Sequence, residues 1–494
     1  MSTTQSTTQS NTAPDAPAAG GLAATAVLRQ LSDLPGPRGW PVLGNIMQVR
    51  PARIHQHIER WCPQYGPMFR LRFGAQRLLV VSDHALINSL MRQRPDGFQR
   101  SARLREVGAE LGGMPGLFSA EGDAWRAQRR MVMASFAPNH VRAFMPLLVK
   151  VALRLHGRWR EAARSGRPID LQNDLKRFTV DVIAGLAFGT EVNTIESGDN
   201  QIQQHLDNAL GGIFRRTMSP LPYWRWFKLP IDRRMERSMA AVGQAIEGFI
   251  GQAKARLQAD PARREHPPNL LEAMLVAAEA EGAKLSDRDV AGNVSTMLFA
   301  GEDTTANTLA WLIWLLHKHP AALRRAQQEV LELVPDLAQA TPQQIDALPY
   351  LEACINEAMR LKPVAPFLVL QALQDTMVGD VQVPRDTLIW CVLRHDSMQD
   401  QHFSRPTEFQ PERWLGEASH SSSAKRVAMP FGSGPRICPG RYLALHEIKL
   451  AMAMVLGSFD ILEVTTPDGG PAQEVMHFTM NPVGLGLRLR ERTS

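Results

Sequence analysis

The stretch from Ser286 to about His319 constrains the fold most, because it is apolar on nearly every face and carries the signals of one long helix. Ser286, with Asp289 three residues later, predicts an N-terminal capping box. Roughly thirty residues at about 1.5 Å each would span about 45 Å. A helix of that length without a polar face must cross the centre of a large domain, so we expect a mainly helical protein built around it.

The middle of this stretch reads GEDTT, which places two acids and two hydroxyls inside an otherwise apolar helix. Burying a charge without a partner costs free energy, so Glu302 and Asp303 need partners or a chemical task. Thr304 and Thr305 allow a second interpretation, in which a hydroxyl bonds back to a carbonyl one turn earlier and bends the helix. The residues alone leave both interpretations open.

Composition places the chain among globular proteins, since 44% of its 494 residues are apolar and 21% are charged. Residues 1–33 are rich in Ser, Thr, Gln, Ala and Pro, so we expect a disordered leader followed by a single domain over 34–494. No apolar run has the length of a membrane span and no signal-peptide pattern is present, so we expect no membrane anchor. The net charge of +6 is too small to favour nucleic acid, but it fits a local basic patch for an acidic protein partner.

The four cysteines favour a reducing compartment and single out one thiol. None of them forms a CxxC pair, so zinc and dithiol-redox interpretations are weak, and so few thiols in so long a chain favour the cytoplasm. Cys438 stands apart because it lies in FGSGPRICPG, a loop with three glycines and two prolines. A structural cysteine is more often a small buried side chain in a regular element. The other three cysteines are Cys62, Cys354 and Cys391.

Short strands flank a helical middle. The pattern over 68–82 alternates around a glycine and predicts a hairpin, and short strands return near 369–390 and 475–490. Residues 84–360 are mostly helical in pattern. In the helix predicted over 348–363, Glu357 and Arg360 share a face, which by itself is typical of a surface ion pair of little energetic value.

Five motifs point to one protein family only when they are taken together in chain order: WRAQRR, AGEDTT, EAMR, PERW and FGSGPRICPG. In this combination the chain, over roughly residues 34–490, resembles a cytochrome P-450, a haem-thiolate monooxygenase. The resemblance implies a mainly α fold with small β-sheets and a long central helix over haem b. It also implies an oxidoreductase that incorporates one oxygen atom of O2 into a substrate.

The resemblance assigns roles to the motif residues. Cys438 would be the proximal thiolate ligand of the haem iron, and a turn rich in backbone N–H groups suits a thiolate. Arg436 would neutralise one haem propionate, while Trp125 and Arg129 would hold the other. The remaining cofactor-binding positions would be Ala300, Phe431 and Gly440, and a buried structural network would consist of Glu357, Arg360 and Arg413.

Two positions depart from the family pattern. Many members carry an arginine five residues before the aspartate of the strand that follows the EAMR helix, and this chain has Leu370 there. One propionate contact is therefore in doubt, or another side chain supplies it. The usual His-Arg-Asp order further on is replaced by Arg394-His395-Asp396.

The same resemblance gives Thr304 and Asp303 catalytic roles, with Thr304 donating a hydrogen bond near bound O2 and Asp303 relaying protons from solvent. Electrons originating from NAD(P)H would arrive through a redox partner. We expect a soluble, monomeric, bacterial-type member without a fused reductase, served by a separate ferredoxin or flavodoxin and its reductase. Basic candidates for the docking surface are Arg130, Arg441 and Lys449.

The substrate pocket is predicted to be apolar, and each of its candidate residues could equally belong to the core. We expect a small apolar organic substrate, and an aromatic segment over 220–230 as a lid or as internal packing. The candidates for the pocket wall are Leu117, Phe118, Phe299, Val364, Phe367 and Met480.

Two other functions compete with the monooxygenase. A haem-thiolate peroxygenase would use hydrogen peroxide, and members of that kind tend to lose the acid–threonine pair. A haem-binding sensor or carrier without turnover would have no need for a proton relay. The intact Asp303–Thr304 pair argues against both.

Overall fold

The computed structural model describes residues 28–113, 116–136, 138–197, 201–279, 286–416 and 423–492. Most of the predicted leader lies outside these residues. Its last part does not, because Arg29–Gln30 forms strand β1, which pairs in parallel with β8 (Val381–Val383), and the short 3-10 helix Leu31–Asp33 follows. Regular structure therefore begins before residue 34, where we placed the start of the domain.

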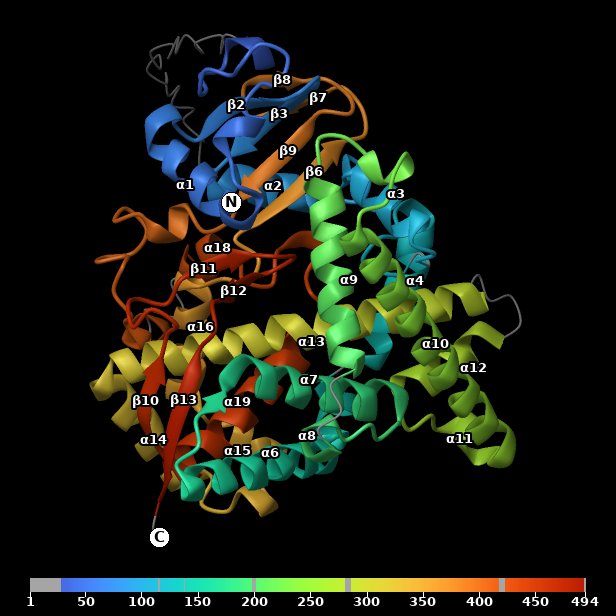
Figure 1. The fold of residues 1–494 in the computed structure, drawn as a ribbon, viewed down its shortest axis with the longest axis vertical. Coiled ribbons are helices and arrows are strands. Elements are labelled where there is room, and N and C mark those ends of the chain that lie inside the picture. Colours follow the sequence, from blue (N-terminus) through green and yellow to red (C-terminus); the bar gives the residue numbers. More distant parts are fainter. Residues whose placement is uncertain are drawn as a thin grey trace, which may run out of the picture.

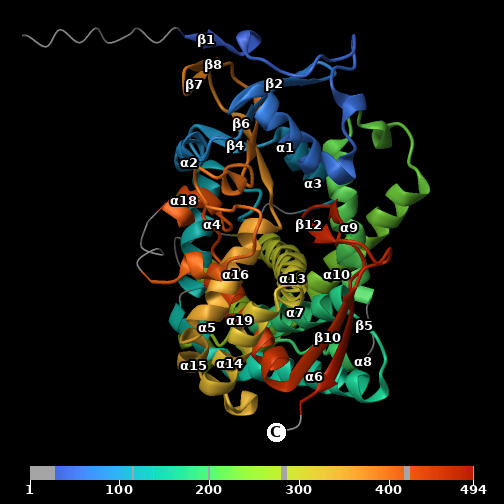
Figure 2. The same ribbon diagram turned by 90° about the vertical axis from the view of Figure 1, so that its left-hand side faces the viewer.

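The predicted long helix is α13, Asp287–Lys318, and it runs through the middle of the helical part (Figures 1 and 2). Its capping box is as predicted, since the Ser286 backbone N–H donates to Asp289 Oδ2 at 2.8 Å and the Asp289 N–H donates to Ser286 Oγ at 3.3 Å. Helix α7 (Leu171–Phe188) packs along it. Burial on almost every side explains why α13 has no polar face.

The other helices surround α13 (Figure 2). None of those described combines the length and the apolar character that crossing a lipid bilayer requires. Their bounds are α1 Ile54–Tyr65, α2 His84–Arg92, α3 Ala102–Glu110, α4 Gly122–Ser135, α5 Pro138–Ala143, α6 Met145–Ser165, α8 Thr194–Ser197, α9 Gln201–Met218, α10 Pro230–Ala259, α11 Ala262–Glu265, α12 Leu270–Glu279, α14 Pro320–Leu333, α15 Pro342–Asp346, α16 Pro349–Leu361, α18 Ser423–Ala428 and α19 Arg441–Ser458.

The largest described sheet lies at the upper end of the view in Figure 1 and has the order β2-β3-β9-β6-β4. The predicted hairpin is confirmed, because β2 pairs with β3 in antiparallel register from Met68↔Val81 to Phe73↔Gln76. Smaller sheets have the orders β1-β8-β7, β10-β13-β5 and β11-β12. The strand bounds are β2 Met68–Phe73, β3 Gln76–Val81, β4 Phe98–Arg100, β5 Ile169–Asp170, β6 Phe367–Ala372, β7 Thr376–Val378, β9 Leu388–Val392, β10 Phe459–Thr465, β11 Glu474–Met476, β12 Met480–Pro482 and β13 Gly486–Glu491.

The pair Glu357–Arg360 on α16 is buried, not exposed at the surface. Arg360 donates from Nε and Nη2 to the two carboxylate oxygens of Glu357, both at 2.8 Å. Arg413 Nε and Trp414 Nε1 donate to the same carboxylate at 3.0 and 2.8 Å. The structure thus brings Glu357, Arg360 and Arg413 together, and a buried network of this kind is strongly destabilised when one partner is removed.

A second charge network involves Arg394, the first residue of the reordered trio. Its guanidinium pairs with Glu59 of α1 at 2.6 Å and with Glu474 of β11 at 2.8 Å. Glu474 also accepts from Lys362 at 2.6 Å and lies 3.0 Å from Nε2 of His55. Glu474 therefore links α1 to the C-terminal hairpin formed by β11 and β12.

The substitution Glu474→Gln tests this junction. Burial alone would raise the pKa of Glu474, but hydrogen bonds and charge from His55, Arg394 and Lys362 outweigh it and hold the pKa well below its usual range. At neutral pH we expect the variant to lose about 3 kcal/mol of unfolding free energy, because buried cations are left without their anion. The contribution of the ionised carboxylate is present above its ordinary pKa of 4.5 and is lost as the pH falls.

Urea unfolding followed from about pH 7 down to about pH 3 should therefore show the wild-type and Glu474→Gln stabilities converging in acid. Glu463→Gln is the matched control, since Glu463 is exposed and lies 4.0 Å from Arg488. The unfolding free energy of Glu463→Gln should stay within about 1 kcal/mol of the wild-type value at every pH. If the difference in unfolding free energy between the wild type and Glu474→Gln did not narrow in acid, the role given to Glu474 would be wrong.

Candidate cofactor and active site

The loop around Cys438 is shaped by glycine. Gly432 and Gly434 have left-handed φ values of 72° and 71°, and a Cβ on Gly434 would lie 2.6 Å from the carbonyl oxygen of Met91 in α2. Only glycine fits such a position. The Cys438 backbone N–H donates to the Phe431 carbonyl at 3.0 Å and closes the turn, and Gly440 caps the start of α19. The thiol therefore lies just before a helix N-terminus, where a negative charge is favoured.

Cys438 differs from the other three cysteines in its surroundings. Burial raises the pKa of its thiol, while the Gly440 N–H and the positive charges of Arg129 and Arg441 act in the opposite direction. Burial raises the pKa of both Cys62 and Cys391 to about 12, and Cys354 is also fully buried. Cys438 alone of the four is not fully buried, so it is the thiol that a metal could reach and deprotonate.

Two guanidiniums and one backbone N–H contact a single carboxylate near this loop, and a third guanidinium, that of Arg100, donates to the Phe118 carbonyl at 2.6 Å. Arg436 forms an ion pair with Glu121 and donates to the Ala120 carbonyl at 2.5 Å. Nη2 of Arg94 lies 3.9 Å from Glu121, and the backbone N–H of Arg100 donates to the same carboxylate at 3.0 Å. We call Arg94, Arg100, Arg436 and Glu121 the arginine cluster.

The arginine cluster is short of negative charge. Nε and Nη2 of Arg94 and Nε of Arg436 are buried without a hydrogen-bond partner. Burial and the neighbouring Arg94 lower the pKa of Arg436 to about 10, and burial with Arg94 and Arg436 lowers that of Arg100 well below its usual range. Three guanidiniums beside one carboxylate fit a ligand with two negative charges, and haem carries two propionates.

Arg100 explains the missing arginine at Leu370. In the register of the sheet, Arg100 of β4 lies directly opposite Leu370 of β6. The guanidinium that the family pattern places on one strand is thus found on its neighbour. Neither Arg94 nor Arg100 was expected from the sequence, because their relation to Cys438 follows from strand pairing and has no local signal.

The predicted residues of α4 lie beside this cluster. Trp125 is buried, and the Arg436 guanidinium stacks over its ring at 4.8 Å. Arg129 is half-buried and close enough to Cys438 for their charges to interact. The structure therefore brings Trp125, Arg129, Arg436 and Cys438 into one region, as the motifs predicted.

The centre of α13 is the accessible part of an otherwise buried helix. Ala300 is exposed and Gly301 and Thr304 are half-buried, while the helix is buried on both sides of them. Thr304 Oγ1 donates to the Ala300 carbonyl at 2.7 Å, which is the back-bonded arrangement that the sequence left open. The small, exposed side chain of Ala300 leaves space for a ligand on this face, whereas a Cβ on Gly301 would lie 3.2 Å from the side chain of Ile183 in α7.

Asp303 is held by side chains on the other side of the backbone. Its Oδ1 accepts from Asn307 at 2.8 Å and lies 3.2 Å from Lys176 of α7, and its Oδ2 accepts from the Thr479 hydroxyl. Glu302 is fully buried with Lys176 Nζ at 3.7 Å. The sequence gave no sign of Lys176 or Thr479 as partners of these acids.

Lys176 also pairs with Asp207 of α9, so one ammonium serves three carboxylates. Burial would lower the pKa of Lys176, but Glu302, Asp303 and Asp207 outweigh it and raise the pKa. Burial raises the pKa of Glu302 well above its usual range. Lys176, Asp207 and Asp303 line a hollow of about 400 Å³, which gives Asp303 a polar route towards solvent.

The predicted pocket wall is partly correct in its geometry. Phe118 lies 6.0 Å from Phe478 between ring centroids, and Leu117 is buried nearby, its N–H donating to Asn293 of α13. Phe299, Val364 and Phe367 are half-buried.

Met480 is misplaced in the prediction. It is fully buried, its N–H donates to the Val364 carbonyl, and its sulfur contacts Arg394. It is a core residue, and Phe478 in the turn between β11 and β12 contacts Phe118 in its place.

The remaining candidates divide between surface and interior. Lys449 is buried and pairs with Glu352 at 2.6 Å, so it is not free to dock a partner, whereas Arg130 and Arg441 are exposed. In the 220–230 segment Trp224 is buried and donates to Glu110, but Trp226 and Phe227 are exposed. Trp224 therefore packs in the interior, while Trp226 and Phe227 lie at the surface.

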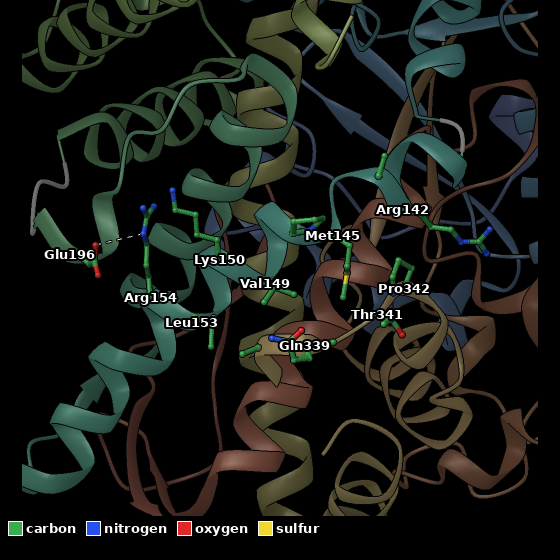
Figure 3. A pocket seen from close by; sticks show the side chains of 14 residues that line it. Arg142, Met145, Val149, Lys150, Leu153, Arg154, Glu196, Gln339, Thr341 and Pro342 are labelled. Atoms are coloured by element: carbon green, nitrogen blue, oxygen red, sulfur yellow. Dashed lines mark ion pairs between the residues drawn. The ribbon is translucent and has the colours of Figure 1, made fainter. Parts of the chain in front are cut away.

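A larger hollow of about 890 Å³ lies away from these residues (Figure 3). It is formed by α5, α6 and the segment 338–342, with Met145 and Val149 in its wall. Its charged residues pair among themselves or with neighbours, as Arg154 does with Glu196 at 3.6 Å and Arg142 with Asp346 at 2.8 Å. It contains none of the predicted site residues.

Comparison with known proteins agrees with this arrangement. A family model described as Cytochrome P-450 matches residues 34–488. The chain is 29% identical to the mitochondrial 25-hydroxyvitamin D-1 alpha hydroxylase of Rattus norvegicus, covering 89% of this chain and 90% of that protein. It is 25% identical to the chloroplastic protein LUTEIN DEFICIENT 5 of Arabidopsis thaliana, covering 94% and 78%. The crystal structure of the cytochrome P450DA heme domain superposes with a TM-score of 0.80 at 25% identity, covering 94% and 99%.

Replacing Arg94 by methionine separates folding from cofactor binding. Nε and Nη2 of Arg94 are buried without a hydrogen-bond partner, and its charge acts on the neighbouring Arg100 and Arg436. We therefore expect Arg94→Met to leave the unfolding free energy of the haem-free chain unchanged or higher. The same change should weaken haem binding about tenfold to a hundredfold, since a charge-assisted hydrogen bond contributes about 1.5–3 kcal/mol.

Urea unfolding of the haem-free chain and haem transfer to a competing apoprotein give the two quantities. Arg92→Met, at an exposed position two residues along, should change neither. Wild-type haem affinity in Arg94→Met, or a clearly destabilised haem-free chain, would show that Arg94 does not serve a bound anion.

Proposed function

Because the chain belongs to the cytochrome P-450 family, we propose that it is a haem-thiolate monooxygenase that inserts one oxygen atom of O2 into an apolar organic substrate. Proteins of this family are oxidoreductases that use haem b, O2 and electrons from NAD(P)H delivered by a redox partner. The observation that carries the proposal is the arginine cluster, which is short of negative charge and lies beside the one cysteine that is not fully buried.

The residues near Cys438 would hold the haem from one side and by its edge. Cys438 would ligate the iron, with Phe431 and Gly440 beside it in the loop. Arg436, Arg100 and Arg94 would neutralise the propionates, helped by Trp125 and Arg129 of α4. When bound, the haem supplies O2 binding and activation, and its thiolate ligand favours cleavage of the O–O bond.

On the α13 side, the chain would manage space and protons. Ala300, which is exposed and small, would leave room for O2 and substrate, whereas Gly301 lets Ile183 of α7 pack closely against α13. The Thr304 hydroxyl, which donates to the Ala300 carbonyl, can rotate to donate a hydrogen bond towards bound O2 and replace its proton from water. Thr304 is thus the general acid that we propose for this site.

Asp303 would supply Thr304 with protons from the solvent side. Its carboxylate is fixed by Asn307, Lys176 and Thr479, so it holds its position at the edge of the 400 Å³ hollow. Water in that hollow would connect it with solvent. The neighbouring Glu302, whose pKa is raised by burial, lies in the same cluster at 3.7 Å from Lys176 Nζ.

The finer features of the function remain those predicted from the sequence. An apolar substrate is supported by the apolar character of the candidate wall, which consists of the buried Leu117 and the half-buried Phe118, Phe299, Val364 and Phe367, with Phe478 added. The redox partner would be a separate ferredoxin or flavodoxin, approaching the exposed Arg130 and Arg441. Four free cysteines support a reducing compartment such as the cytoplasm, and a soluble, monomeric, bacterial-type protein stays our prediction.

The alternatives rank lower for a structural reason. Asp303 and Thr304 lie on α13 with defined partners and a polar route to solvent. A peroxygenase receives its protons with hydrogen peroxide, and a sensor or carrier turns nothing over, so neither needs this arrangement.

Cys438→Ser tests the ligand assignment. We expect the variant to keep its fold, because serine fits the volume and the turn is closed by the backbone. The carbon monoxide complex of the reduced protein should lose the strongly red-shifted Soret band of a thiolate-ligated haem. Cys391→Ser, a change at a buried cysteine of β9, is the control and should keep that band. An unchanged spectrum in Cys438→Ser would overturn the assignment.

Thr304→Ala tests the proton path. With NAD(P)H and a surrogate redox partner, we expect hydrogen peroxide released per electron pair to rise severalfold, because the variant lacks the hydroxyl that would deliver a proton at this site. Thr308→Ala is the matched control, since Thr308 donates to the Thr304 carbonyl at 2.8 Å in the same back-bonded way one turn along α13. Equal coupling in Thr304→Ala and Thr308→Ala would remove Thr304 from the mechanism.

A further inference from the structure

Two histidines and an aspartate that are far apart in the sequence meet behind the Cys438 loop. His84 is the first residue of α2, Asp396 begins the 3-10 helix Asp396–Met398, and His402 lies in the loop that follows. Asp396 Oδ2 lies 2.9 Å from Nδ1 of His84 and 3.7 Å from Nε2 of His402. One donor atom from each residue lies within 4.8 Å of the other two.

We propose that His84, Asp396 and His402 bind one Zn²⁺ ion. Two imidazole nitrogens and a carboxylate oxygen are a donor set that suits zinc. Bonds of about 2.0–2.2 Å in a tetrahedron place donor atoms about 3.3 Å apart. The two distances from Asp396 lie on either side of that value, so small side-chain rotations complete the site.

Capping of α2 does not account for this group of side chains. Asp83 caps α2 by accepting the Leu86 backbone N–H at 2.7 Å, and Asp396 Oδ2 adds a bond from the His84 backbone N–H at 2.8 Å. His402 is not needed for capping, because 3.7 Å is too long for a hydrogen bond. Its ring nevertheless stands 4.7 Å from the His84 ring, at an angle of 80°.

Nε2 of His402 is the ring nitrogen that faces the other two residues. It lies 3.7 Å from Asp396 Oδ2 and 3.1 Å from the Gln401 amide nitrogen, a contact that a zinc ion would replace. The side chains of His84, Asp396 and His402 are 25%, 10% and 21% exposed. The site is therefore open to solvent on one side, which provides an entry path and a position for water as fourth ligand.

An ion at this place would connect two supports of the Cys438 loop. The far end of α2 presents the Met91 carbonyl to Gly434 of that loop. The segment that starts at Asp396 presents the Ser397 carbonyl to Arg360 of the buried network, at 2.6 Å. Zinc would thus tie α2 to this segment and stabilise the folded chain in proportion to its occupancy.

The test uses the full-length, haem-loaded protein, freed of metal by a chelator and titrated with zinc chloride in a calorimeter. We expect one Zn²⁺ per chain with a dissociation constant of about 1 μM, and a melting temperature that rises with zinc concentration. His402→Ala should weaken zinc binding at least about tenfold. Even the loss of a residue that only hydrogen-bonds to a metal ligand lowers metal affinity by that much. His266→Ala, at an exposed histidine after α11, should bind zinc as the wild type does.

The variant His402→Ala carries the test even if His84→Ala fails to fold, because His402 makes no hydrogen bond to Asp396. The carbon monoxide spectrum of each preparation shows that the haem site is intact. Binding of much less than one ion per chain would overturn the proposal. Equal affinity in His402→Ala and wild type would overturn it too, since the zinc would then be bound elsewhere.

Discussion

Burial of α13 on nearly every side is the constraint on which the rest of the structure depends. A helix of 32 residues without a polar face can fold only if other helices cover it, and α7 does so along much of its length. The accessible strip at Ala300, Gly301 and Thr304 is the exception within it. A ligand that reaches the centre of α13 meets this strip, so the residues that serve the ligand must be brought to it.

Two buried charge clusters are unbalanced in a way that a bound ligand or a proton would correct. The arginine cluster has an excess of positive charge, and the cluster around Lys176 has an excess of carboxylates. Like charges that are buried together cost folding free energy unless a counter-charge or a proton joins them. A dianionic ligand suits the first cluster, and uptake of a proton suits the second, because burial raises the pKa of Glu302. Both clusters are therefore better explained by function than by stability.

The sequence predicted what is local and missed what depends on register. The capping box of α13, the hairpin over 68–82 and the tight turn before Cys438 are each encoded within a few residues, and each has the expected form. Arg94 and Arg100 meet Arg436 only through the pairing of β4 with β6 and the packing of α2 on the loop, which no short pattern reveals. Met480 and Lys449 were misjudged because residue type alone does not tell which side of a strand or helix faces the core.

The position of Arg100 opposite Leu370 has a consequence for how related chains are compared. A position-by-position alignment would score this chain as lacking a cationic residue, although the same charge is present one strand away. A side chain moved to the directly opposite position of the neighbouring strand keeps its charge in the same part of the sheet, because such positions lie about 5 Å apart. For this fold, the natural unit of comparison is the pair of neighbouring strands, and a search for divergent relatives should score both positions jointly.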